Sequence, residues 1–393
     1  MSKTKLSALH SMILLSAKID STQEEIEQLD EQLILIKDWD FAVDVLIERA
    51  VAPLFYKKLP LLSNRSLIPS RCKDKLTQVY YLTLSRGIVH YEVMSLVTKL
   101  LQENRIDFLV LKGAYLAEKL YKDIALRQFS DLDLLIKEED GEKAQRVLTN
   151  AGFQPENHSM AQFLRDNLGF EHYAPLVYQG VSVELHIRLN HPGEKFEILT
   201  NKVFENAEIT HIKGTEIKVP DKYDVLIHTC VHLHKHFNEG QVQFTSFNDI
   251  VNLLHLEWNE ADWKTLIERC NKYKCKSFVF KYLGIVSEYY KVLLPDEVNV
   301  IIAQLITEKD RRRFVNYLLG NYSKHFSVET RVKRVIHVQG FFTKLKYFFW
   351  MLFPSKKYMI RSYNIKNQRY YWIYYPYRHW IVLRGLWKMI SEK

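Results

Sequence analysis

Residues Val110–Ile136, VLKGAYLAEKLYKDIALRQFSDLDLLI, decide the fold of this chain. Their pattern predicts a strand that ends at Lys112-Gly113, then a helix, then a second strand that carries Asp131 and Asp133. Side chains two residues apart on a strand point to the same face of a sheet, so the two carboxylates are predicted to lie side by side. A glycine at the start of a helix lets backbone approach a phosphate group closely. The stretch therefore predicts parts of a phosphoryl-transfer site.

The composition is that of an ordinary folded protein. Its residues are 47% apolar and 26% charged. The length of 393 residues is enough for two or three domains. The four cysteines form no CxxC pair and no disulfide framework, which indicates a reducing compartment. An apolar patch at Met12–Leu15 is short and lacks a cleavage site, so we expect mature protein rather than a signal peptide. No run reaches the roughly 18 uncharged apolar residues that a membrane-spanning helix needs, so we expect a cytoplasmic location.

Changes in composition divide the chain into four predicted domains. They are an N-terminal helical region (1–104), a core of strands and helices (105–220), a second helical domain (221–329) and a basic aromatic region (330–393). In the first region, apolar residues at helical spacing predict helices over 24–35, 41–49 and 73–104. The segment NRSLIPS between them is predicted to be a loop. In the third region, helices are expected to begin near Asp221, Asp249, Asp262, Lys276 and Asp310.

The predicted core mixes strands with helices. IDFLVL is a nearly continuous apolar run, typical of a buried strand. Val181–Leu189 alternates strictly, with apolar side chains on one side and polar ones, including Glu184 and His186, on the other. ITHIKGTEIKVP is typical of a hairpin with Lys-Gly near its turn. We therefore expect an α/β (α+β) fold: a small mixed β-sheet with helices packed on it, flanked by helical regions.

Three acidic residues are the candidate metal ligands. Phosphoryl transfer depends on cations that neutralise the phosphates, and hard divalent cations take carboxylate oxygens as ligands. Asp131 and Asp133 supply two carboxylates, and a third is expected on a neighbouring strand, where Glu184 is the best candidate. The alternative is that the pair is an ordinary strand end and that Glu184 is a solvated edge-strand residue.

LKGAYLAEKLYKDIALRQFSDLDLLI followed by VELHIRL resembles the nucleotidyltransferase (DNA polymerase beta-like) superfamily, and most closely its bacterial "uncharacterised nucleotidyltransferase" family. The family pattern runs LKG, a leucine-rich helix with Tyr near its end, R-x-x-x-D-x-D-L-L, and later an E-L-H strand. The close match covers roughly residues 105–190, which makes 105–220 a nucleotidyltransferase core. One departure is Gly113-Ala114, where the superfamily often has Gly-Gly or Gly-Ser, so one hydroxyl donor to phosphate is missing.

The resemblance implies an enzyme that uses Mg²⁺ (or Mn²⁺) to move a nucleoside monophosphate from an NTP such as ATP to an acceptor, with release of pyrophosphate. Asp131, Asp133 and Glu184 would be catalytic metal ligands. The acceptor stays open between a small molecule, a glycan precursor, a peptide and a protein. One alternative is a non-catalytic nucleotide-binding or membrane-surface scaffold protein with the same fold. Another is a toxin–antitoxin nucleotidyltransferase that acts on tRNA or protein.

Four residues of the matched segments are predicted to bind the nucleotide: Lys112, Gly113, Arg127 and His186. Lys112 and Arg127 suit the triphosphate, as a point charge and a planar fork respectively. The alternatives are a lysine that merely extends to solvent at a strand end and an arginine that pairs internally with Asp131. His186 shares a face with the third acid, where it binds acceptor, orients a ligand carboxylate or has a structural role.

A histidine cluster follows in IHTCVHLHKHF. On a helix, His228, His232 and His236 fall on one face. A zinc site is one interpretation. The favoured one is that these histidines line the cleft between sheet and helical domain, together with Asp249 at the start of a nearby helix.

The C-terminal region carries all of the excess positive charge. Thirteen Lys and Arg and no Asp or Glu lie between Thr330 and Ser391, so the remaining chain has a net charge of −4 against +9 for the whole. Seventeen of the 51 Phe, Trp and Tyr lie within 341–387. Three interpretations are open: aromatics packed on the core, which is slightly favoured, then peripheral contact with the inner face of a membrane, and, less favoured, nucleic-acid binding.

Overall fold

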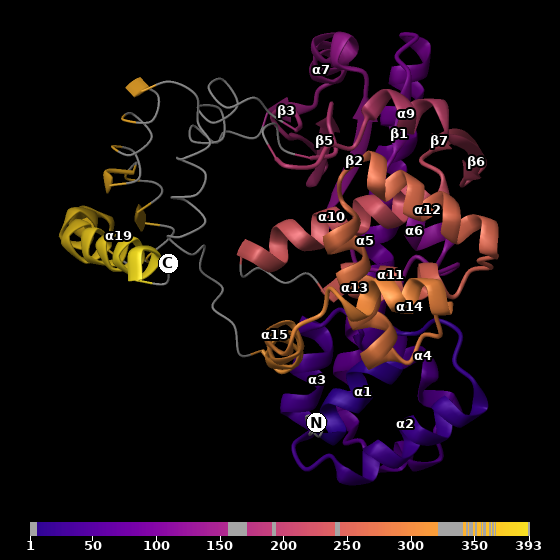
Figure 1. Cartoon of the computed structure of the whole chain (residues 1–393). Helices are drawn as coiled ribbons and strands as arrows, with labels where there is room; N and C mark the ends of the chain where they lie inside the picture. The colour runs from indigo at the N-terminus through magenta and orange to yellow at the C-terminus, as the bar shows by residue number, and fades with distance from the viewer. Residues whose placement is uncertain are drawn as a thin grey trace. The chain divides into compact units, whose positions relative to one another are not determined.

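The computed structural model describes residues 6–155, 171–190, 194–239 and 244–320, and parts of 341–391. The chain forms two compact units. The larger consists of residues 1–158, 170–234 and 243–321, and the smaller of 159–169, 235–242 and 322–393. Figure 1 shows the strands and most helices in the larger unit and α19 (Tyr374–Ser391), drawn in yellow, in the smaller one. The smaller unit also contains the short 3-10 helix η4 (Gln368–Ile373).

A five-stranded mixed sheet forms the centre of the larger unit. Its strand order is β1-β2-β5-β4-β3, and the strands span Phe108–Val110, Asp131–Ile136, Val181–His186, Leu176–Tyr178 and Gln154–Pro155 in that order. β2 and β5 are parallel, whereas β1–β2, β4–β5 and β3–β4 are antiparallel. The expected mixed sheet is confirmed. The short β3 and β4 were not predicted, because two or three residues carry no readable alternation.

One face of this sheet is the apolar core. Leu132 and Leu134 of β2 lie beside Val183 and Leu185 of β5. Two helices contribute buried apolar residues to the same cluster: α5 (Ser70–Glu103) and α7 (Gly141–Asn150). Because side chains alternate along a strand, the other face takes the odd-numbered residues of β2 and the even-numbered residues of β5. That face is polar, and it holds the candidate site.

The hairpin β6 (Glu208–Ile212) and β7 (Thr215–Val219) forms a separate two-stranded sheet, as its sequence predicted. Lys213 and Gly214 both have positive φ angles of 48° and 80°, which a two-residue hairpin turn requires. Lys218 Nζ lies 2.7 Å from Asp107 Oδ1, beside β1.

The N-terminal region is helical, as expected. Its helices are α1 (Ala8–Ser16), α2 (Gln23–Leu35), α3 (Trp39–Glu48), α4 (Ala52–Lys58) and α5. Ser7 and Thr22 cap α1 and α2 with reciprocal side-chain bonds to the third helical residue, which satisfies amides that would otherwise lack partners. The segment predicted as a loop contains a 3-10 turn, η2 (Ser63–Leu67), which follows a similar turn, η1 (Leu59–Leu61).

After the hairpin the chain is helical again, with α10 (Lys222–Glu239), α11 (Phe244–Leu254), α12 (Glu260–Lys272), α13 (Lys276–Tyr290), α14 (Asp296–Ala303) and α15 (Glu308–Leu318). A short helix, α9 (Thr200–Glu205), precedes the hairpin. One expectation is wrong: Asp249 does not begin a helix but lies in the middle of α11. The helix α14, whose N-cap is Pro295, was not predicted.

Asp249 is interior because it is one half of a buried ion pair. Arg127 Nε and Nη2 donate to Asp249 Oδ1 and Oδ2 at 2.8 and 2.7 Å, and both side chains are almost fully buried. Tyr121 Oη donates to the same carboxylate at 3.0 Å, and Arg127 Nη1 donates to the carbonyl of Gly113 at 3.1 Å. The pair therefore joins α11 to the start of α6 (Lys112–Lys119), directly beside β2.

Arg127→Met is expected to lower the free energy of unfolding by about 3–5 kcal/mol, because the substitution leaves the Asp249 carboxylate buried without its countercharge. Urea denaturation measures the change. Arg146→Met removes an exposed arginine that pairs with Glu142, and this control is expected to unfold like the unmodified chain. Equal midpoints for the two variants would contradict a role of the buried pair in stability.

Candidate active site

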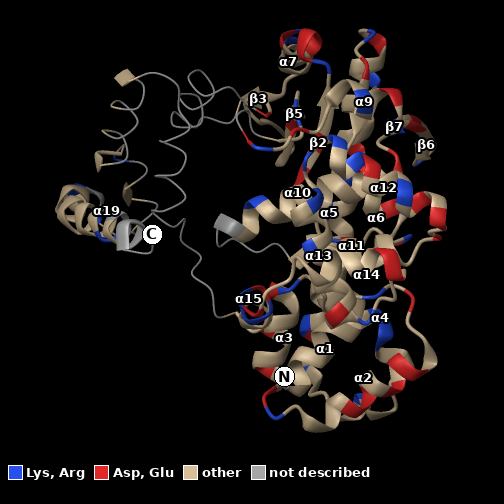
Figure 2. Ribbon diagram, in the orientation of Figure 1, with Lys and Arg blue, Asp and Glu red and all other residues tan. Residues whose placement is uncertain are grey.

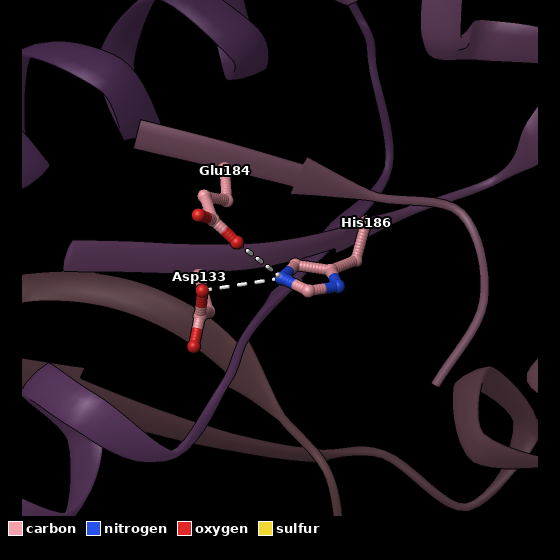
Figure 3. Close-up of side chains that lie close together, drawn as sticks. All are labelled: Asp133, Glu184 and His186. Atoms are coloured by element: carbon pink, nitrogen blue, oxygen red, sulfur yellow. Dashed lines mark hydrogen bonds and ion pairs between the residues drawn. The ribbon is translucent and has the colours of Figure 1, made fainter. Parts of the chain in front are cut away.

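The candidate site forms where β2 and β5 lie side by side in parallel. Asp131 pairs with Ser182, and Asp133 pairs with Glu184, in the register of the two strands. Paired residues on neighbouring strands project to the same face, so the β2 carboxylates and Glu184 share the polar face. Figure 3 shows Asp133 and Glu184 converging on the ring of His186, which lies further along β5.

The three side chains in Figure 3 form a compact donor group. His186 Nε2 lies 3.1 Å from Asp133 Oδ1 and 3.4 Å from Glu184 Oε2. One ligand atom from each of the three lies within 4.8 Å of the others. In the described part of the chain, this is the group of three or more Asp, Glu, His and Cys side chains that is compact enough to hold a metal ion. Asp131 lies on the same face, next to this group.

Lys112 closes the other side of the site. It is the first residue of α6, its side chain is largely buried, and its Nζ lies 3.9 Å from Asp133 Oδ2. The amide of Leu111, just before the helix, donates to the carbonyl of Asp133 at 2.9 Å, which fixes the helix start against β2. No side chain caps this N-terminus. Its first amides are therefore available to an anionic group.

Gly113 lies where the start of α6 approaches β2. A β-carbon at this position would lie 3.4 Å from the carbonyl oxygen of Asp131 and 3.6 Å from the Phe129 side chain. The glycine therefore lies against β2 at the first candidate ligand, and its backbone φ is not in the left-handed region.

The titration of the carboxylates reflects how closely they are packed. Burial, together with the charges of Asp133 and Glu184, raises the pKa of Asp131 to about 6. Burial opposes ionisation of Asp133 as well, but its hydrogen bond to His186 and the charge of Lys112 lower its pKa below the usual range. Burial disfavours the charged form of His186, yet the bonds to Asp133 and Glu184 raise its pKa to about 9.

This arrangement fits a divalent cation. Two carboxylates about 4 Å apart repel by roughly 4 kcal/mol at an effective dielectric constant of 20. In the structure, His186 and Lys112 offset part of that repulsion by ion pairs with Asp133, but the pKa of Asp131 stays raised. The oxygen donors suit Mg²⁺ or Mn²⁺.

The other predicted nucleotide contact, Arg127, lies behind the site. Its guanidinium is engaged by Asp249 and by the carbonyl of Gly113, and not by Asp131, the alternative partner expected from the sequence. Through these bonds it holds the start of α6 in place. This geometry favours positioning of the α6 start by Arg127 over contact with a triphosphate.

Two residues of the site were not predicted. His172 pairs with His186 through an isolated antiparallel bridge, and its Nε2 lies 3.7 Å from Glu184 Oε2. Glu171 is buried, and its carbonyl accepts from the amides of Ile187 and Arg188. Both residues lie just before β4 and outside any regular strand, so no periodicity marked them. The histidine in GFEHY was the available signal.

The histidine cluster of α10 is divided by the fold. His228 is buried, and its pKa lies well below the usual value because of burial and of the positive charges of Lys112 and His186. It therefore lies near the site, as the cleft interpretation expected. His234 instead stacks on Phe278 with ring centroids 4.5 Å apart, and its Nδ1 lies 3.2 Å from Tyr282 Oη. The described members of the cluster form no compact metal-ligand group.

His234 is expected to make the fold acid-sensitive. Burial, with the charges of Lys281 and Arg313, lowers its pKa from 6.5 to about 4. The unfolded state then binds more protons between these values, so stability falls as the pH decreases from 6.5 to 4, by about 3 kcal/mol in total. His234→Gln should make this slope shallower by the contribution of one histidine, as measured by urea denaturation across that pH range. His211→Gln, at an exposed histidine, should retain it, and an unchanged slope in His234→Gln would contradict the assignment.

Residues 37–291 match the family described as uncharacterised nucleotidyltransferase. Because the match covers more than half of the chain, this protein belongs to that family. It is a transferase by class, and the family implies a nucleoside triphosphate as substrate. The resemblance noted over residues 105–190 is thereby confirmed and extended in both directions. A search of curated proteins gives no match.

Two solved structures show a distant likeness. One is the solution structure of the antibiotic-resistance factor ANT(2'')-Ia, with 8% identity, a TM-score of 0.29, and coverage of 59% of this chain and 97% of that one. The other is a nucleotidyltransferase-like antigenic protein from Paracoccidioides brasiliensis, with 14% identity, a TM-score of 0.28, and coverage of 55% and 93%.

Proposed function

We propose that this chain transfers a nucleoside monophosphate from an NTP to an acceptor hydroxyl with the aid of Mg²⁺ or Mn²⁺, and that pyrophosphate is released. The observation that carries the proposal is the parallel register of β2 and β5. It gathers three carboxylates on one face, beside a lysine and an uncapped helix start. We further propose residues 105–220 as the core that contains this machinery.

The three carboxylates have distinct proposed tasks. Asp131 and Asp133 of β2 would hold the cation, and Glu184 of β5 would complete the ligand set. A bound divalent cation neutralises phosphate charge and aligns the reacting oxygens. Glu184 also accepts the proton of the acceptor hydroxyl. At the same time the oxygen of that hydroxyl forms a bond to the α-phosphorus. The bond from the α-phosphorus to the bridging oxygen breaks, and pyrophosphate leaves.

The basic groups bind and position. Lys112 Nζ lies 3.9 Å from Asp133 Oδ2, where its charge would bind a phosphate group of the NTP. The first amides of α6, at Lys112 and Gly113, donate to phosphate oxygens in the way that helix starts do. His186 holds the Asp133 and Glu184 carboxylates at a fixed separation through its ring nitrogen. Arg127 positions the helix start through its bond to the Gly113 carbonyl.

Replacement of both aspartates tests the proposal. Asp131→Ala combined with Asp133→Ala is expected to lower pyrophosphate release from an NTP by at least about a thousandfold, because the site loses its cation ligands. Glu216→Gln, at an exposed acid on β7, is the matched control and should retain full release. Pyrophosphate is measured with a coupled phosphatase assay, and the acceptor is found as a nucleotide adduct by mass spectrometry of small molecules, tRNA and protein.

Binding separates the alternatives. If the unmodified chain binds NTP with Mg²⁺ but releases no pyrophosphate with any acceptor fraction, it is a nucleotide-binding scaffold. Release at the unmodified rate by the double variant would contradict the site assignment.

A further inference from the structure

Helix α19 has two different faces. On one, Val382 is buried, Tyr375 Oη donates to the carbonyl of Pro354 at 2.7 Å, and His379 Nε2 lies 3.2 Å from the carbonyl of Leu352. Phe353 packs against the rings of Tyr375 and His379 with centroid distances of 5.9 and 5.0 Å. This face therefore anchors α19 within the smaller unit.

The opposite face of α19 is apolar and exposed. Large side chains there are each at least half exposed: Ile373, Tyr377, Trp380, Leu383 and Trp387. Their spacing of three or four residues places them along one stripe of the helix, which starts at the end of η4. Tyr377 and Trp380 stack at 6.1 Å, and the Arg384 guanidinium lies 5.3 Å from the Trp380 ring. The stripe is continuous, whereas exposed apolar residues on most proteins are scattered.

Further exposed apolar residues lie earlier in the same unit. Phe341, Phe342, Leu345 and Phe349 are all more than half exposed, and their spacing also follows one side of a helix. The expectation that the aromatic residues of this region are buried is therefore wrong for these positions.

Charge accompanies the exposed stripe. Figure 2 shows Lys and Arg but no Asp or Glu on α19, and from Thr330 to Ser391 the sequence has 13 Lys and Arg and no acidic residue. Tryptophan and tyrosine favour the boundary between lipid and water, and basic side chains favour anionic headgroups. In the described residues, no helix is both long and apolar enough to cross a bilayer. A helix of this kind lies in the plane of the membrane surface.

We propose that the α19 stripe and its basic flanks form a binding site for an anionic lipid bilayer surface. The ligand class is an anionic phospholipid headgroup layer together with the upper acyl chains. A single-stranded nucleic acid would use the same charges and aromatic rings, but Ile373 and Leu383 have no stacking surface to offer to bases. Leu383 lies between Trp380 and Trp387 in the stripe, and this apolar side chain favours lipid. This site is separate from the β2–β5 face and does not depend on the transferase reaction.

Vesicle binding by the full chain tests the proposal. The chain should co-sediment with vesicles of phosphatidylcholine and phosphatidylglycerol, and much less with phosphatidylcholine alone. Trp380→Ser with Leu383→Ser and Trp387→Ser should weaken binding at least about tenfold, because partitioning scales with buried apolar area. Arg384→Gln with Lys388→Gln should weaken it about fivefold for each charge removed.

Matched controls distinguish lipid binding by this stripe from nonspecific hydrophobic adsorption and from misfolding. Ile209→Ser with Leu293→Ser and Val300→Ser removes three exposed apolar residues of the larger unit and should leave vesicle binding unchanged. Each variant should keep its far-ultraviolet circular dichroism and its NTP binding. Equal binding to both kinds of vesicle, or equal loss with the control triple, would overturn the proposal. Binding of a labelled single-stranded RNA without vesicle binding would overturn it in favour of nucleic acid.

Discussion

The parallel pairing of β2 with β5 sets Asp133 opposite Glu184, and the placement of the other polar groups of the site follows from that pairing. A slip of one residue would turn Glu184 and His186 into the core and bring Val183 and Leu185 onto the polar face. The apolar side chains packed against α5 and α7 make such a slip costly. The core therefore fixes the register, and the register gathers the acids.

Gathering acids in a half-buried place has an electrostatic cost that the fold offsets locally. His186 and Lys112 form ion pairs with Asp133. The ion pair of Arg127 with Asp249 lies beside the start of α6 and holds it in place. Burial, followed by the charges of Asp133 and Glu184, still raises the pKa of Asp131. Residual repulsion of this kind is common at functional sites, since a structural cluster would be under selection to remove it. A divalent cation would relieve it.

The sequence allowed prediction of the individual strands and helices, but not of several side-chain contacts between residues that are distant in the sequence. The D-x-D spacing and the strict alternation around Glu184 were readable because strand geometry is periodic. The hairpin was readable because Lys213-Gly214 suits its turn. Asp249 was misplaced because an aspartate near a helix resembles a cap, and its partner Arg127 is distant in the sequence. His172 was missed because it acts from an irregular segment, and its contact with Glu184 arises only from tertiary structure.

The chain thus combines a site on a rigid sheet with a separate basic unit whose apolar stripe is exposed. Anomalous diffraction from crystals grown with Mn²⁺ and a non-hydrolysable NTP tests the central claim most directly. The account predicts a manganese peak bound by carboxylate oxygens of Asp131, Asp133 and Glu184, with the triphosphate next to Lys112. A metal bound elsewhere, or a triphosphate bound away from the β2–β5 face, would contradict it.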